Sequence, residues 1–393
     1  MDFTYLKNFM DELVAKGIPG NGAIVYKDGK KVFEYASGYA SVEEKIPMDT
    51  KKQINIYSCS KPMTVVAALQ LYEQGKFLLS DPLYNYIPEF SKVYIKDENG
   101  NLTESKKPIT MWNLFTMTSG YNYSREASVF EKAREITGGK MDTVQVIKCL
   151  AKQPLLFEPG EHWQYGLSHD ILAAVVEVIS GMRFADYVKK NIFNKLEMNS
   201  SYYHKTPEIE AKMAEQYKCL TESGETDIVN LQKSAHSFDG EVVNIGKDVV
   251  VHGFGENYDS GGAGIITTIE DYSKFVAALA SGGKGLNGER ILSPTTIELM
   301  HTNQLSEEQL APNFNWPQLT GYGFGLGVRT MIDKAKGGSN GNIGEFGWGG
   351  AAGATVLADT KENLAVFYAH HMLNPHEEYY QPRLRNVVYS CLD

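Results

Sequence analysis

The spacing of hydrophobic positions changes twice along the chain, and these changes predict strands at both ends with helices between them. Residues 3–14 repeat apolar side chains at helical spacing, and Gly17 follows where a helix would end. Asp28-Gly29, a dipeptide typical of tight hairpin turns, separates apolar runs at residues 22–25 and 31–35. Further helices are expected at residues 62–74, 112–117, 143–151, 171–179 and 184–192, strands at 324–331, 354–357 and 364–369, and a closing helix at 382–392.

This order of elements predicts an α+β protein. We expect an antiparallel sheet built from both termini and flanked by helices, with a mainly helical insertion. The expected domains are a sheet domain formed by residues 1–75 and 256–393 and a mainly helical domain formed by residues 76–255. The active site is expected between them.

The composition excludes several classes of protein. Hydrophobic residues make up 42% and charged residues 22% of the 393-residue chain, which is ordinary for a globular protein and excludes a disordered one. The formal net charge of −10 argues against nucleic acid or an anionic membrane as the main partner. No uncharged apolar run of about 18 residues occurs, so no membrane span is expected. Lys7, Asp11 and Glu12 interrupt the first apolar segment, which argues against a secretory signal and predicts a cytoplasmic location.

The cysteines and histidines do not predict a metal or a disulfide. The four cysteines lie far apart and form no Cys-x-x-Cys pair, so free thiols are expected at Cys59, Cys149, Cys219 and Cys391. The histidines at residues 370–371 and 376 have no acidic or cysteine partner at ligand spacing, so no metal is predicted. The chain also lacks a Walker loop and a dinucleotide fingerprint, so no cofactor is predicted.

Ser58 and Lys61 form a Ser-x-x-Lys motif at the start of the expected helix at residues 62–74. One helical turn brings residues three apart onto the same face, so the amine can reach the hydroxyl. A serine hydroxyl is a weak nucleophile until a neighbouring base takes its proton, and a lysine in suitable surroundings can do so. The motif alone is weak evidence, because a second copy at residues 281–284 lies in a glycine-rich stretch that predicts a loop.

The order of several motifs resembles the superfamily of class C β-lactamases and penicillin-binding proteins, and most closely its branch of β-lactamase-like carboxylesterases. The similarity runs from about residue 20 to residue 390. It rests on residues 56–62 (IYSCSKP), 75–82 (GKFLLSDP), 116–120 (TMTSG), 157–160 (FEPG) leading to Tyr165, 260–264 (SGGAG), 292–294 (LSP) and 323–327 (GFGLG).

The resemblance implies roles for further residues. A tyrosine of this superfamily works beside the Ser/Lys pair, and Tyr165 stands at the matching position. Whether Lys61 or Tyr165 takes the serine proton is left open, since coupled groups share their titration. The resemblance further implies an oxyanion hole formed by the N–H groups of Ser58 and Ala351, and a substrate that lies along Gly349 and Gly350.

Two departures from the family pattern bear on the substrate. Trp348 stands where penicillin-recognising members have a cationic residue that helps to hold a substrate carboxylate, and Leu167 replaces the usual asparagine two places after the tyrosine. Both changes exchange polar contacts for apolar surface, which favours neutral, hydrophobic acyl groups. The sequence therefore predicts a serine hydrolase that acts through an acyl-enzyme on small-molecule esters.

Two alternatives stay open. The same chemistry would act on a β-lactam, a D-alanyl peptide or another small amide. A non-catalytic binding or sensor protein on the same scaffold is the second alternative, and retention of Ser58, Lys61 and Tyr165 argues against it. The sequence does not predict an oligomeric state.

Overall fold

The computed structural model describes residues 1–97, 99–123, 131, 134–135, 137–220, 238, 240–247, 254–311 and 313–392. Among these residues the largest sheet has nine strands, and its paired neighbours run antiparallel. The sheet order is β10 (Tyr322–Phe324), β11 (Arg329–Met331), β12 (Phe346–Gly347), β14 (Ala354–Asp359), β15 (Leu364–His370), β1 (Gly20–Lys27), β2 (Lys30–Ser41) and β3 (Ile46–Pro47), with β13 (Gly349–Gly350) paired to β14.

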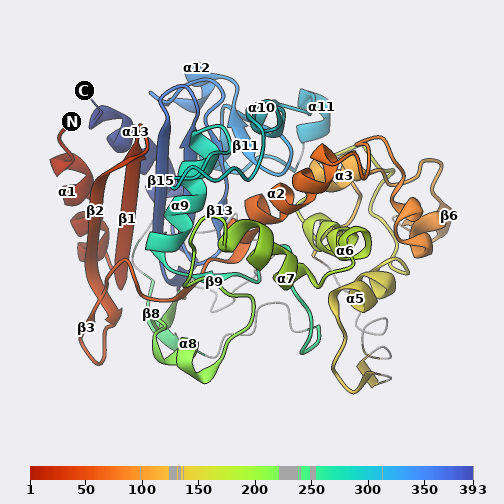
Figure 1. Ribbon diagram of the computed structural model, residues 1–393, viewed down its shortest axis with the longest axis horizontal. Helices are drawn as coiled ribbons and strands as arrows, with labels where there is room; N and C mark the ends of the chain where they lie inside the picture. The colour runs from red at the N-terminus through yellow and green to blue at the C-terminus, as the bar shows by residue number, and fades with distance from the viewer. Residues whose placement is uncertain are drawn as a thin grey trace.

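The two ends of the chain meet in the middle of this sheet, as the sequence predicted. The hairpin of β1 and β2 turns at Asp28 and Gly29, whose φ angles of +52° and +73° suit a tight turn. β1 then pairs with β15, so that Ile24 lies opposite Phe367. Both termini lie on the same side of the molecule (Figure 1). The predicted α+β fold with a sheet built from both termini is confirmed.

Helices cover both faces of the sheet, which explains why its central strands β14 and β15 are buried along their whole length. On β15, Ala365 and Phe367 join one buried cluster, whereas Val366 and Tyr368 join another on the opposite face. The helix α9 (Ile269–Ala280) packs on the first face, and α1 (Thr4–Ala15) and α13 (Glu377–Ser390) pack together on the second (Figure 1). Alternate side chains of one strand therefore enter two cores.

A group of helices from the middle of the chain gathers beside the sheet, on the right of Figure 1. α2 packs against α6, which also contacts α3, α5 and α7. Their bounds are α2 (Ser60–Glu73), α3 (Met111–Phe115), α5 (Thr143–Leu150), α6 (Ser168–Ser180) and α7 (Phe184–Val188), the last followed by a π-helical turn (Lys189–Phe193). Within the described residues the expected helices of this region are confirmed, with ends shifted by a few residues. The division of the chain into two domains stays a prediction.

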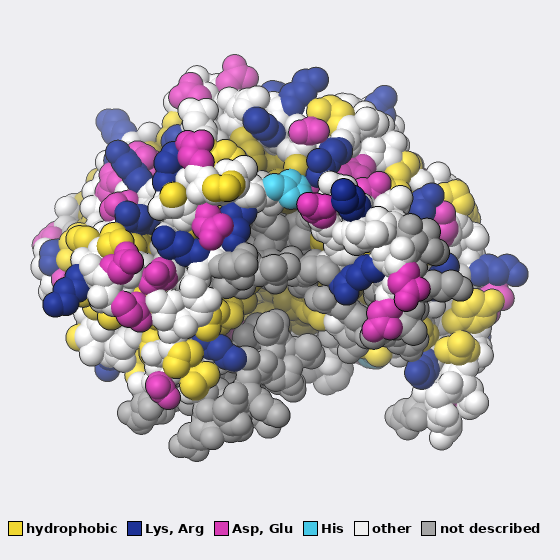
Figure 2. Space-filling model, turned by 90° about the horizontal axis from the view of Figure 1, so that it is seen from below, with side chains coloured by type: hydrophobic (Ala, Val, Ile, Leu, Met, Phe, Trp, Pro, Cys, Tyr) yellow, Lys and Arg dark blue, Asp and Glu magenta, His cyan; other side chains and the backbone are white. Residues whose placement is uncertain are grey.

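Shorter elements complete the described chain. The small sheets pair β4 (Ile54–Asn55) with β9 (Ile266–Thr267), β5 (Tyr94–Lys96) with β6 (Leu102–Glu104), and β7 (Gln216–Cys219) with both β8 (Val242–Gly246) and β16 (Met372–Leu373). The short helices are α8 (Pro207–Ala211), α10 (Pro294–His301), α11 (Glu307–Leu310) and α12 (Lys334–Gly337). The four cysteines are free, as expected. On the face drawn in Figure 2, acidic and basic side chains are interspersed rather than gathered by sign.

Two sequence expectations were wrong in detail. The single strand expected at residues 324–331 is two strands, β10 and β11, joined by a turn that includes Gly327 at a φ of +75°. The closing helix begins at Glu377 rather than at residue 382. Pro382, where the helix was expected to begin, lies inside it.

Candidate active site

Ser58 lies in a short 3₁₀ turn (Tyr57–Cys59) that leads directly into α2. Tyr57, the residue before it, has a φ of +47°, a conformation that side chains other than glycine rarely adopt. Lys61 follows in the first turn of α2 and is only 1% exposed. Its Nζ lies 3.1 Å from Ser58 Oγ. The structure therefore places the predicted nucleophile and amine in hydrogen-bond contact.

Lys61 has two other acceptors besides Ser58. Its Nζ donates to the hydroxyl of Tyr123 at 2.9 Å and to the carbonyl oxygen of Gly262 at 2.8 Å. These three partners satisfy the amine in either state, because an ammonium donates to all three and a neutral amine donates to two and accepts from the Ser58 hydroxyl. This arrangement holds the amine beside the serine hydroxyl without leaving a buried donor unpaired.

The loop that supplies the Gly262 carbonyl is fixed by a buried carboxylate on α6. Asp170 Oδ1 accepts hydrogen bonds from the hydroxyl of Ser260 at 2.8 Å and from the Gly262 N–H at 3.2 Å. A Cβ at Gly262 would lie 2.4 Å from Asp170 Oδ2, so the close approach requires glycine. The Ser-Gly-Gly-Ala-Gly motif thus serves to present a backbone oxygen to Lys61.

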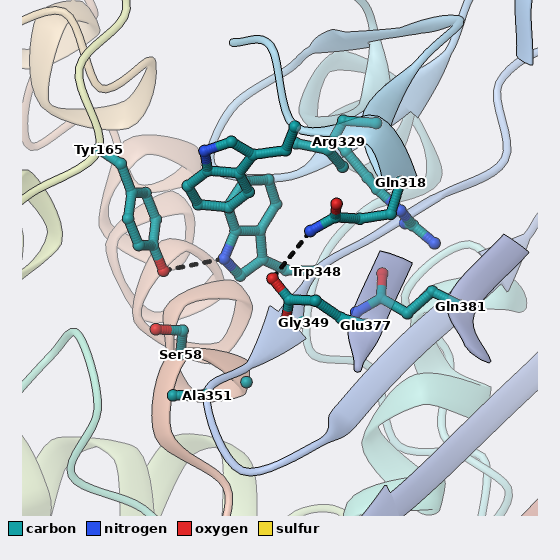
Figure 3. A pocket seen from close by; sticks show the side chains of 12 residues that line it. Ser58, Tyr165, Gln318, Arg329, Trp348, Gly349, Ala351, Glu377 and Gln381 are labelled. Carbon is teal, nitrogen blue, oxygen red and sulfur yellow. Dashed lines mark hydrogen bonds between the residues drawn. The ribbon is translucent and has the colours of Figure 1, made fainter. Parts of the chain in front are cut away.

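Tyr165 lies beside the Ser/Lys pair, but its hydroxyl bonds to a different partner. The indole Nε1 of Trp348 donates to the Tyr165 oxygen at 3.0 Å (Figure 3). Lys61 Nζ lies over the Tyr165 ring, 4.7 Å from its centroid. Ser58 and Tyr165 line the same pocket. The three predicted side chains are therefore neighbours, although the phenol that accepts the Lys61 hydrogen bond belongs to Tyr123.

Sequence reasoning missed Tyr123. Its ring packs edge-on against Tyr165, with centroids 5.5 Å apart. Burial raises the pKa of the Tyr123 hydroxyl well above its usual range, and the nearby Tyr165 raises it further. One signal was present, because Tyr123 follows the Thr-Met-Thr-Ser-Gly motif by three residues. With 23 tyrosines in the chain, that signal could not be separated from the others.

The pocket beside Ser58 has a volume of about 430 Å³, part of which is open to solvent. The residues that line it are Ser58, Tyr165, Trp316, Gln318, Leu319, Arg329, Trp348, Gly349, Gly350, Ala351, Glu377 and Gln381. Ala351 lies close to Ser58 at one end (Figure 3). The backbone groups assigned to the oxyanion hole thus border one cavity, and their role stays a prediction.

The predicted substrate-binding residues separate into two groups. Trp348, Gly349 and Gly350 line the pocket. Leu167 is not among the described residues that line it. Leu167 is 1% exposed and packs in the main hydrophobic core at the residue before α6. The structure therefore does not bring Leu167 to the pocket.

Gly350 lies in tight contact with the segment that carries the nucleophile. A Cβ at this position would lie 2.2 Å from the carbonyl oxygen of Ile56, two residues before Ser58. We expect Gly350→Ala to lower the free energy of unfolding by about 1–3 kcal/mol, because one backbone must move away from the other. Urea denaturation measures the change. Gly349→Ala is the matched control, since its Cβ would meet the flexible end of Gln381 at 2.8 Å. Equal losses in the two variants would contradict this account.

The end of the pocket beyond Trp348 contains a buried carboxyl group. Glu377 is 7% exposed and accepts a hydrogen bond from Gln318 Nε2 at 2.8 Å. Among the described residues, no lysine or arginine forms an ion pair with Glu377. Burial raises the pKa of Glu377 to about 7, and the negative charge of Glu378 also raises it.

This carboxyl group predicts a pH dependence of stability. Between about pH 4.5 and 7 the folded protein holds the Glu377 proton while the unfolded chain has lost it, so the free energy of unfolding falls as the pH rises. Glu377→Gln removes this term. We expect the stability of the variant relative to wild type to be about 2 kcal/mol higher at pH 8 than at pH 5, measured by urea denaturation. The exposed Glu208→Gln serves as the control, and the same change in both variants would argue against the assignment.

The described residues contain neither a candidate membrane-spanning helix nor a cluster of metal-binding side chains. In the part of the chain that the structure describes, no helix is long and apolar enough to cross a membrane. Over the same residues, no group of three or more His, Cys, Asp or Glu side chains is placed to hold a metal ion.

Comparisons with known proteins agree with this geometry. A family model described as Beta-lactamase matches residues 6–389. Protein Rv1367c of Mycobacterium tuberculosis is 28% identical over 341 residues, which cover 84% of this chain and 80% of that protein. Esterase EstB of Burkholderia gladioli is 26% identical over 371 residues, which cover 91% of this chain and 87% of the esterase. The solved structure of unliganded simvastatin synthase (LovD) from Aspergillus terreus aligns with a TM-score of 0.79 at 20% identity, over 100% of this chain and 99% of that one. That likeness shows a common fold.

Proposed function

Because the chain belongs to the beta-lactamase family, we propose that it is a serine hydrolase that cleaves small carboxylic esters through an acyl-enzyme on Ser58. The observation that carries the proposal is the 3.1 Å contact between Lys61 Nζ and Ser58 Oγ at the edge of a pocket. The similarity to Esterase EstB supports ester cleavage.

The site residues divide the reaction into two steps. Ser58 Oγ attacks the ester carbonyl carbon, and its proton passes to Lys61 or Tyr165. The N–H groups of Ser58 and Ala351 stabilise the negative oxygen of the tetrahedral intermediate. The C–O bond to the alcohol then breaks, and the alcohol leaves with the proton. In the second step water attacks the acyl-enzyme along the same proton path, which releases the acid and restores Ser58.

The surroundings of Trp348 support an ester in place of a β-lactam. Trp348 is 3% exposed and packs in an aromatic cluster with Trp163 and Phe324. Its indole donates to Tyr165, so it presents a neutral aromatic surface where the family pattern has a cation. A substrate carboxylate would find no positive partner at this position, whereas a neutral ester does not need one.

One panel of substrates tests the proposal. The wild-type protein is incubated separately with p-nitrophenyl butyrate, a chromogenic cephalosporin and a D-Ala-D-Ala peptide. We expect turnover of the ester and labelling of Ser58 by a fluorophosphonate, located by peptide mass spectrometry. Faster turnover of the cephalosporin or the peptide would replace the esterase with the corresponding alternative. An absence of both turnover and labelling would favour a non-catalytic binding protein.

A further inference from the structure

The pocket beside Ser58 has two chemically different ends. Near the nucleophile it is bordered by Tyr165, Trp316 and Trp348, which form an aromatic wall. Beyond Trp348 it is bordered by polar side chains from other elements (Figure 3). Glu377 and Gln381 come from α13, and Gln318 comes from the turn before β10. A purely apolar substrate would leave this second end unused.

Several polar atoms at this end are buried without being fully paired. Among the described residues, Gln318 Oε1 and Arg329 Nη1 have no hydrogen-bond partner. Gln318 is 5% exposed and Arg329 is 2% exposed. The carboxyl group of Glu377 receives one hydrogen bond, from Gln318 Nε2, and has no cationic partner within the described chain. Buried polar atoms without partners are costly, so this end of the pocket favours a ligand that bonds to them.

The charges decide what kind of group fits. The positive charge of Arg329 is balanced by Glu345, to which its Nη2 donates at 3.0 Å, and the same nitrogen donates to the carbonyl oxygen of Val356 at 3.2 Å. Glu377 and Gln318 line the pocket, and Gln318 Oε1 is an acceptor without a partner among the described residues. Above a pH of about 7 the Glu377 carboxyl group is ionised, so it would repel a substrate carboxylate, whereas a hydroxyl, amide or ammonium group could donate to it.

We propose that the pocket selects substrates that carry a hydrogen-bond donor several atoms from the scissile carbonyl, and that Glu377 accepts the hydrogen bond from this donor. This inference rests on the proposed ester hydrolysis and names its substrate class. The donor lies at the polar end of the pocket while the ester carbonyl lies at Ser58, so Glu377 determines specificity and takes no part in proton transfer. Gln381 packs against the backbone of β13 beside Glu377 and helps to shape this end, since a Cβ at Gly349 would lie 2.8 Å from its Nε2.

Methyl esters of matched length test the proposal. In the first series the acyl chain has four to seven heavy atoms and ends in a methyl, hydroxyl, ammonium or carboxylate group. A second series, of acetate esters, places the same groups in the alcohol part. Hydrolysis is followed at pH 8, where Glu377 is ionised, by chromatography of the released acid. We expect kcat/KM of wild type to favour the hydroxyl or ammonium ending over methyl by about 10-fold or more at the best length. The series in which this preference appears tells which part of the ester reaches Glu377.

Variants then assign the preference to one side chain. Glu377→Leu should reduce the preference to within about threefold, and Glu377→Gln should lose it for ammonium while keeping part of it for hydroxyl. Glu378→Gln, one residue along α13 and outside the described pocket lining, should keep the wild-type ratio. A ratio that is unchanged in both Glu377 variants, or a wild-type preference for carboxylate, would overturn the proposal. If Glu377→Leu does not fold, the Gln variant and the wild-type series decide. Failure of the proposed function is distinct, because the methyl-ended esters would then not be cleaved at all.

Discussion

Ser58→Ala is expected to lower kcat/KM for p-nitrophenyl butyrate by about 10,000-fold or more, because the variant has no oxygen with which to form the acyl-enzyme. The Lys61 amine and the pocket lining remain, so a small residual rate from the oxyanion hole and from binding is expected. Ser58 is partly exposed in the middle of its 3₁₀ turn, and loss of one hydroxyl there should leave the fold intact. Steady-state kinetics measures the loss, and circular dichroism checks the fold.

The chain offers its own control for this variant. Ser281 begins the second Ser-x-x-Lys motif, and its hydroxyl bonds to Asn363 Oδ1 at 2.8 Å in the turn after α9. Ser281→Ala removes the same atom from the same short motif outside the pocket, and it should leave ester turnover unchanged. Turnover by Ser58→Ala within tenfold of wild type would mean that the nucleophile is another residue.

The parts of the site that the sequence predicted are those set by local geometry. Ser58 and Lys61 are separated by about one turn, so their contact follows from the start of α2. The hairpin at Asp28-Gly29 likewise depends on two adjacent residues with positive φ. Tyr165 is distant in the chain, and only the resemblance to a family could single it out.

The parts that the sequence missed depend on contacts between distant segments. Tyr123 and Glu377 reach the site from stretches more than 250 residues apart, and nothing local distinguishes them from other tyrosines and glutamates. Leu167 shows the opposite error. Its position in a family pattern suggested a substrate contact, whereas its side chain is buried in the main core. A sequence pattern fixes where a residue lies along the chain, but packing decides which way its side chain points.

The two tyrosines beside Lys61 are expected to differ in their contribution to catalysis. Burial raises the pKa of Tyr123 well above its usual range, so its phenol stays protonated and serves as an acceptor that positions Lys61. Tyr165 borders the pocket, and its oxygen receives a hydrogen bond from the Trp348 indole, which stabilises negative charge that develops on that oxygen. The proximity of Lys61 Nζ to the Tyr165 ring adds to this effect. Tyr165 is therefore the better candidate to exchange a proton with Ser58 or with the leaving alcohol.

Tyr165→Phe should accordingly lower kcat/KM by about 100- to 10,000-fold, the range typical of a lost general acid–base group, and should flatten the pH profile of kcat. Tyr123→Phe should lower it by about tenfold or less and should keep the shape of that profile, because Lys61 retains its bonds to Ser58 and Gly262. Tyr5→Phe, on the exposed side of α1, controls for loss of a phenol anywhere in the chain. A larger loss in Tyr123→Phe than in Tyr165→Phe would make Tyr123 the proton-transfer residue, since Tyr123 is the phenol that accepts the Lys61 hydrogen bond. Tyr165 would then act only through its packing against Trp348.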